Sequence, residues 1–119
     1  MTIKSTNVDP AGTAVFLPTD TVFELLLDDR RRYAMYSLSQ RRGGMSLDEL
    51  VDQLVAREGP LTDGQRDEIE LSFRHNHLRK LVDAGVVSYD SETDTIDRRR
   101  AARALDPYLE LAARDSIGA

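Results

Sequence analysis

Residues 72–89 read SFRHNHLRKLVDAGVVSY, and this stretch decides the predicted fold. Apolar residues at Leu78, Leu81 and Val82 recur at helical spacing, and the pattern stops at Gly85. A glycine directly after a helix adopts the left-handed conformation that ends it, and the β-branched residues that follow favour a strand. The stretch therefore predicts a helix that ends in a glycine cap and leads into a β-strand.

Three shorter helices are predicted before this one and a hairpin after it. Capping residues followed by amphipathic runs place the helices at 22–27, 30–40, 47–57 and 66–84. Two short runs at 86–89 and 95–98, joined by polar turn residues, predict a β-hairpin. Residues 99–114 return to near-helical spacing but contain Pro107, which predicts two short helices or one kinked helix.

The end of the long predicted helix also resembles a known family. His77-Leu78, then Leu81, then AGVV at 84–87 is similar to the recognition-helix ending of arsenic-repressor-type winged helix-turn-helix regulators. The run from about residue 21 to residue 89 resembles a small winged-helix domain family that is widespread in halophilic archaea. The resemblance implies a mainly α fold with a small β-hairpin wing, an α+β winged helix-turn-helix with an extra C-terminal helix.

This interpretation divides the chain into three parts. Residues 1–18, which contain Pro10, Gly12 and Pro18, are expected to form a flexible N-terminal arm, in which 13–17 could add an edge strand. Residues 19–98 would form the winged helix-turn-helix domain. Residues 99–119 would form a C-terminal helical segment that serves dimerisation. A chain of 119 residues is the size of one folded unit with tails.

The charged residues are unusual in kind. Of 16 basic residues 14 are Arg, and of 21 acidic residues 14 are Asp, with a net charge of -5. The arginines gather in three places: the acid-free windows 30–47 and 71–82, and the run 98–103. Basic clusters on an acidic background are what a nucleic-acid binder needs, because phosphate contacts supply most sequence-independent affinity. The alternative is that these arginines are solvated or form ion pairs with the many acids.

A helical wheel at 100° per residue divides the long helix into two faces. It places Leu71, Phe73, His77, Leu78, Leu81 and Val82 on the core side, and Ser72, His75, Asn76, Arg79 and Asp83 opposite, with Lys80 at the edge. Arg can contact guanine and Asn can contact adenine through two hydrogen bonds, so we predict base contacts from His75, Asn76 and Arg79. The resemblance implies the same three positions, although His75 stands where the family usually has Ser. The alternative is a solvated helix face without a partner.

Other classes of site find little support in the sequence. The chain has no cysteine, and two histidines at i and i+2 point to different helix faces, so no metal site is predicted. Gly43-Gly44 lacks the pattern of a phosphate-binding loop, and the paired carboxylates fit surface positions of an Asp-rich chain. No cofactor, no enzymatic activity and no membrane span are expected, and a cytoplasmic location follows from the absence of a signal-like N-terminus.

The sequence therefore predicts a sequence-specific, DNA-binding transcriptional regulator that acts as a homodimer on double-stranded DNA. Contacts to the DNA backbone are expected from seven residues: Ser72, Lys80, Arg41, Arg42, Arg98, Arg99 and Arg100. Dimerisation is expected from Leu105, Tyr108 and Leu109 together with the first helix, because one small core should not bury them all. The alternative is a winged-helix module that binds another regulator without contacting DNA. The operator, the sign of regulation and any small-molecule effector are not predicted.

Overall fold

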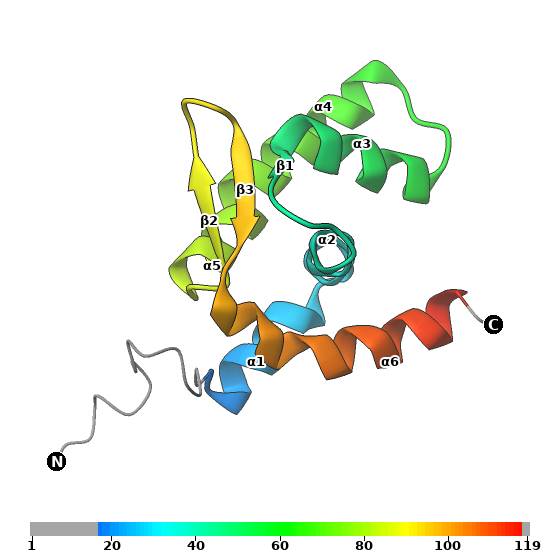
Figure 1. Ribbon diagram of the computed structural model, residues 1–119. Coiled ribbons are helices and arrows are strands. Elements are labelled where there is room, and N and C mark those ends of the chain that lie inside the picture. The colour runs from blue at the N-terminus through cyan, green and yellow to red at the C-terminus, as the bar shows by residue number, and fades with distance from the viewer. Residues whose placement is uncertain (1–16, 118–119) are drawn as a thin grey trace, which may run out of the picture.

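The computed structural model describes residues 17–117 of the chain, so the predicted N-terminal arm lies outside the described residues except for Leu17 and Pro18. The structure is mainly helical with a small three-stranded antiparallel sheet (Figure 1). In chain order the elements are α1 (Thr19–Leu27), α2 (Asp29–Ser39), β1 (Met45–Ser46), α3 (Leu47–Glu58), α4 (Asp63–Ser72), η2 (Phe73–His77), α5 (Leu78–Asp83), β2 (Val87–Asp90), β3 (Thr95–Arg98), η3 (Arg100–Leu105) and α6 (Asp106–Ile117). None of the described helices combines the length and apolar character that crossing a bilayer requires.

The predicted long helix is continuous but contains a turn of different geometry. It starts at Asp63, where Thr62 and Gln65 form a complete capping box, and runs through α4, η2 and α5 to Asp83. The middle segment η2 is a π-helical turn, which holds more residues per turn than an α-helix. The predicted glycine cap is confirmed: Gly85 has φ +80°, and the amide of Val86 donates to the carbonyl of Leu81 at 3.2 Å.

The sheet has the strand order β1-β3-β2, and the predicted hairpin is confirmed as β2 and β3. The short strand β1 was not predicted, and it pairs Met45 with Ile96 on the outer side of β3. Gly44 allows this pairing, because a Cβ at this position would come within 2.6 Å of the Thr95 side chain and 2.7 Å of that of Asp97. Figure 1 shows the hairpin projecting away from α1 and α6.

One hydrophobic core joins all these elements. The helix α2 lies in the middle and packs against α1, α3, η2, β3 and α6. The predicted division near Pro107 is confirmed, since the 3₁₀ helix η3 ends at Leu105 and α6 begins at Asp106. Ala102, Leu105 and Leu109 of this C-terminal segment are buried in the same core as the residues of α2 and α3. The segment 99–114 is therefore packed as part of the folded unit.

Candidate nucleic-acid interface

The long helix presents its proposed base-reading residues to solvent. His75, Asn76 and Arg79 are all exposed, and none makes a side-chain hydrogen bond or ion pair to another of the residues 17–114. On the opposite side, Ile69, Phe73, His77 and Leu81 are buried at intervals of four residues. In a regular α-helix each residue is slightly displaced around the axis from the residue four positions before it, so a row of such residues gradually leaves the core-facing side. The π-helical turn holds more residues per turn, and this offsets the displacement. The three polar side chains thus share one open face of a helix whose other face is fixed in the core.

The same π-helical turn corrects the helical wheel at two positions. Leu71 and Val82 were predicted to face the core, but their exposed fractions are 59% and 39%. The wheel used 100° per residue throughout, and the π-helical turn at 73–77 shifts the angular positions on its two sides. The open face of the helix therefore carries apolar surface beside its polar residues.

His77 is a buried, hydrogen-bonded histidine, as predicted. Its Nδ1 lies 3.2 Å from Arg31 Nη1 and its Nε2 lies 3.7 Å from Asp28 Oδ1. Because guanidinium can only donate, Nδ1 accepts, and the proton of the neutral ring is assigned to Nε2, towards Asp28. Burial lowers the pKa of His77; the carboxylate of Asp28 acts against this shift, and the charge of Arg31 adds to it.

Three arginines of the first acid-free window, Arg30, Arg31 and Arg32, bind groups of the chain itself. Arg31 donates to the carbonyl oxygens of Leu25 at 3.0 Å and Glu24 at 2.8 Å, and Arg32 donates to that of Leu26 at 2.6 Å. These are carbonyls of the last turn of α1, which lack partners within their own helix. The sequence offered a signal that was missed: arginines directly after a helix can cap its final carbonyls. Arg30 pairs with Glu58 through two bonds, of 2.6 and 2.9 Å.

The predicted backbone-contact residues fall into two groups. Three of them are held by acids of the chain: Arg41 pairs with Glu49, Lys80 with Glu24 at 3.4 Å, and Arg98 with both carboxylate oxygens of Asp106 at 2.7 and 2.9 Å. The side chain of Arg98 is 21% exposed, and its pairing with Asp106 makes a phosphate contact less favourable than it would be for an unpaired arginine. The arginines of the second group, Arg42, Arg99 and Arg100, have no ion pair to any of the residues 17–114. Ser72, which is uncharged, completes this group.

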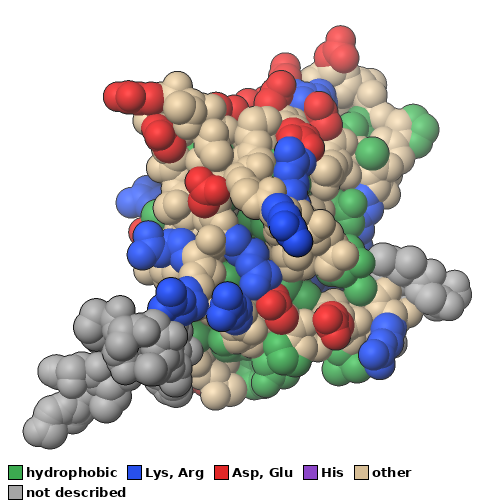
Figure 2. All heavy atoms as spheres, viewed as in Figure 1, with side chains coloured by type: hydrophobic (Ala, Val, Ile, Leu, Met, Phe, Trp, Pro, Cys, Tyr) green, Lys and Arg blue, Asp and Glu red, His purple; other side chains and the backbone are tan. Residues whose placement is uncertain are grey.

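Acidic residues limit where a polyanion could approach. The turn of the hairpin carries exposed Asp90 and Glu92, and the helices α3 and α4 carry exposed Asp48, Asp52 and Asp67. Figure 2 shows this segregation: acidic side chains gather around the hairpin turn and over α3 and α4, whereas Lys and Arg side chains lie lower, near the base of the hairpin. Repulsion would keep DNA phosphates away from the tip of the hairpin. A backbone contact is therefore more favourable at the base of the hairpin.

The predicted dimerisation residues are only partly available. Leu105 and Leu109 are buried by their own chain, so their assignment to a subunit contact is wrong: the core accommodates them, contrary to the argument from chain length. Tyr108 is 44% exposed and contacts Phe23 edge-on, with ring centroids 6.1 Å apart. Four large exposed apolar residues lie on these two helices: Phe23, Leu27, Tyr108 and Leu111. We call them the α1–α6 apolar surface, and Figure 2 shows hydrophobic side chains along this lower edge.

The lowered pKa of His77 predicts a stability that depends on pH. The unfolded chain, in which His77 titrates near 6.5, binds the proton more tightly than the folded protein. Stability is therefore fully present above about pH 6.5 and decreases as the pH falls from there through the folded pKa, by at most about 1.4 kcal/mol per pH unit. Urea denaturation between about pH 7.5 and 5.5 should show this decrease, and His77→Asn should remove it. The same substitution at exposed His75 is the control, and an equal effect of both variants would contradict the assignment.

One of three comparisons with known proteins found a match. A family model described as "Domain of unknown function (DUF7344)" matches residues 23–97, from α1 into β3. Since this match covers well over half of the chain, the chain belongs to that family. Neither the curated proteins nor the solved structures contain a match.

Proposed function

We propose that this member of the DUF7344 family binds double-stranded DNA as a transcriptional regulator with a winged helix-turn-helix fold. In this proposal the helix α4–η2–α5 enters the major groove, α3 supports it, and β2 and β3 form the wing. The order of the elements supports it, because helix, strand, two helices and a hairpin follow each other as such a fold requires. The predicted cytoplasmic location and absence of catalysis belong to the same proposal.

The observation that carries the proposal is the open helix face with His75, Asn76 and Arg79. All three side chains are exposed and unpaired with described residues, although acids are available nearby for many other arginines of the chain. All N–H groups of a long side chain that is free in this way can still donate hydrogen bonds to the edge of a base. The buried residues at four-residue spacing hold the helix rigidly behind this face. Rigid support of this kind is needed to place a side chain accurately at a base edge.

The backbone contacts are assigned to a smaller set than the sequence suggested. Arg42, Arg99 and Arg100 are exposed and have no acidic partner among residues 17–114. Arg99 is anchored at the base of the hairpin by its amide, which donates to the carbonyl of Val86 at 2.9 Å. Ser72, which is partly exposed on the long helix, adds a neutral donor. Arg41, Lys80 and Arg98 would have to exchange an internal carboxylate for a phosphate, which makes their net contribution small.

The α1–α6 apolar surface is the proposed dimer contact. Its four large side chains lie on two helices that touch through Phe23 and Tyr108. Exposed apolar residues that are contiguous on neighbouring helices favour association. A two-fold dimer would place two long helices on successive turns of DNA, and two half-sites multiply affinity and specificity.

A second candidate function is a protein-interaction module, and two features favour it. Leu71 and Val82 add apolar area to the same helix as the polar residues, as in a protein interface with a mixed surface. The acidic hairpin turn is also unsuited to a wing that touches phosphates. In this alternative the helix face would bind another regulator.

Base contacts are tested by the double substitution Asn76→Ala with Arg79→Ala. Each residue, if it forms paired hydrogen bonds to a base, should contribute about 1–3 kcal/mol of discrimination, so the variant should lose about ten-fold or more in specific affinity. A mobility-shift assay against genomic fragments measures it, with Arg114→Ala, an exposed arginine of α6, as control. Wild-type binding that survives the double substitution contradicts the assignment to this face. Absence of DNA binding by the wild type favours the protein-interaction module.

Backbone contacts are tested by comparing two adjacent arginines. Arg99→Ala should reduce the magnitude of the slope of log affinity against log salt concentration by about one charge, because one released counterion is lost. Arg98→Ala removes a charge already neutralised by Asp106, so the slope should remain unchanged. Titrations at several salt concentrations measure both. Equal slopes for both variants would contradict the division between free and paired arginines.

The dimer contact is tested with two leucines of equal exposure. Leu111 in α6 and Leu71 in α4 both have an exposed fraction of 59%, so replacement by Asp should leave the fold intact in each case. Leu111→Asp should convert the dimer into a monomer, because a buried unpaired carboxylate is costly in an apolar interface. Leu71→Asp should remain dimeric. Size-exclusion chromatography with light scattering measures the mass, and a dimeric Leu111→Asp protein would exclude this surface.

A further inference from the structure

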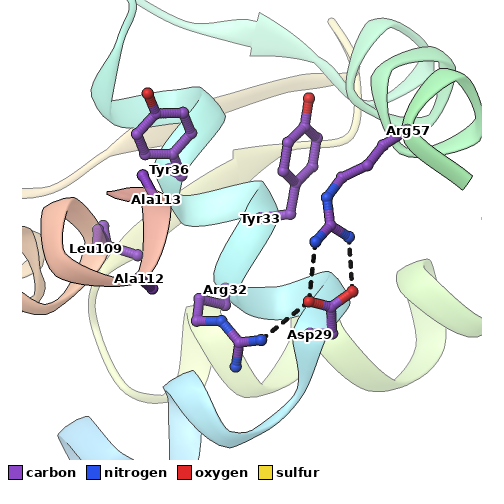
Figure 3. A pocket seen from close by; sticks show the side chains of 8 residues that line it. All are labelled: Asp29, Arg32, Tyr33, Tyr36, Arg57, Leu109, Ala112 and Ala113. Carbon is purple, nitrogen blue, oxygen red and sulfur yellow. Dashed lines mark hydrogen bonds and ion pairs between the residues drawn. The ribbon is translucent and has the colours of Figure 1, made fainter. Parts of the chain in front are cut away.

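A pocket lies between α2 and α6, away from the face of the long helix that carries His75, Asn76 and Arg79. Figure 3 shows the eight residues that line it: Asp29, Arg32, Tyr33, Tyr36, Arg57, Leu109, Ala112 and Ala113. The space open to the centre of a water molecule is about 50 Å³. A single buried water needs only about 10–15 Å³ on this measure, and a cavity that encloses benzene has about 150 Å³, so the pocket can take up part of a small ring while the rest of the ring stays outside it.

The two sides of the pocket differ in chemistry. Leu109, Ala112 and Ala113 form an apolar wall on α6, with Tyr36 beside them in Figure 3. The other side carries Tyr33 and the charged groups, and the Arg57 guanidinium lies 4.8 Å from the centroid of the Tyr33 ring. Small alanine side chains on the outer helix leave the space that a larger residue would fill. The arrangement suits a ligand with a flat apolar body and one polar end.

The charges in the pocket select the sign of that polar end. Asp29 accepts hydrogen bonds from Arg57 at 2.6 and 3.0 Å and from Arg32 at 2.9 Å. The hydrogen bond from Arg57 is the main reason why the pKa of Asp29 is lowered, so this carboxyl is ionised and already neutralised. Two guanidinium groups against one carboxylate leave one excess positive charge. Hydrogen bonds to Leu26 and Asp29 use four of the ten N–H donors that these two guanidinium groups carry.

We propose that this pocket binds a small carboxylic acid with an apolar ring, such as an aromatic acid. The ring lies against Leu109, Ala112 and Ala113, and the carboxylate receives hydrogen bonds from Arg32 and Arg57. A cationic ligand would meet the excess positive charge, and a neutral one would leave it uncompensated. The inference goes beyond the proposed DNA binding and does not depend on it, since none of the lining residues belongs to the proposed base-reading set.

The site is tested on the full chain without DNA. Benzoate is titrated into labelled protein and amide shifts are followed by NMR, with benzyl alcohol and benzylamine as ligands of similar shape but different charge. Benzoate should bind with a dissociation constant on the order of 1 mM, and should shift the signals of Leu109 to Ala113 and Tyr33. The alcohol and the amine should bind about ten-fold more weakly or worse, because each lacks the charge-assisted bonds. No saturable shift with benzoate, or equal binding of the three ligands, overturns the proposal.

Two variants locate the binding within the pocket. Ala113→Leu fills the apolar wall and should abolish binding, and Arg32→Met removes the charge and should weaken it about ten-fold. Ala104→Leu on η3 and Arg114→Met on α6 repeat these changes outside the pocket and should leave the affinity unchanged. The NMR spectrum of each protein without ligand shows whether it is folded. Unchanged affinity in folded Ala113→Leu protein would place benzoate elsewhere and overturn the proposal, whatever the outcome of the DNA-binding experiments.

Discussion

The buried guanidinium of Arg31 is the interaction on which the arrangement of the helices depends. It bonds to two carbonyls of the last turn of α1, belongs to the first turn of α2 and reaches Nδ1 of His77 in the long helix. One side chain thereby connects three helices. Such a group is tolerated in a core because its donors find acceptors, and removing one partner would leave a buried charge uncompensated. Asp28 completes the junction, because its carboxylate accepts from the amides of Arg30 and Arg31 and caps α2.

The π-helical turn at 73–77 lies where this junction meets the long helix. His77 closes that turn and faces Arg31, while Phe73 opens it and is fully buried. His75 and Asn76, between them, are the exposed residues of the proposed interface. The turn thus keeps core residues four apart on one side of the helix and displays the residues between them on the other. Its position at the proposed site agrees with the frequent occurrence of π-helical turns at functional sites.

Charge is used in two ways in this chain. Most arginines stabilise the fold: they cap carbonyls, as Arg31 and Arg32 do, or form paired bonds to carboxylates, as Arg30 and Arg98 do. Six arginines are exposed without a partner among residues 17–114, and four of these, Arg42, Arg79, Arg99 and Arg100, are assigned to DNA, whereas Arg103 and Arg114 are not. The proposed DNA face, the α1–α6 apolar surface and the pocket between α2 and α6 are built from different residues. Each of the three can therefore be altered without changing the others.

Local patterns in the sequence were sufficient for the elements whose causes are local. The glycine cap at Gly85, the hairpin of β2 and β3, the division at Asp106-Pro107 and the burial of His77 were all predicted, because caps, turns and helical spacing act over a few residues. The exposure of His75, Asn76 and Arg79 was predicted in the same way. Tertiary structure alone decided which charges are free. Arg98 and Arg99 are neighbours in sequence, yet only Arg98 meets Asp106.

The same reason explains the errors in the prediction. Leu105 and Leu109 entered the core because α6 packs on α2, and Leu71 and Val82 were exposed because a π-helical turn changed the helix rotation. The pocket between α2 and α6 joins residues from three distant segments, so no local pattern could have indicated it. Sequence by itself determined the elements and the polar face of the long helix. The pairing of charges and the packing of helices, which depend on distances between remote residues, decided which of these groups remain available to a partner.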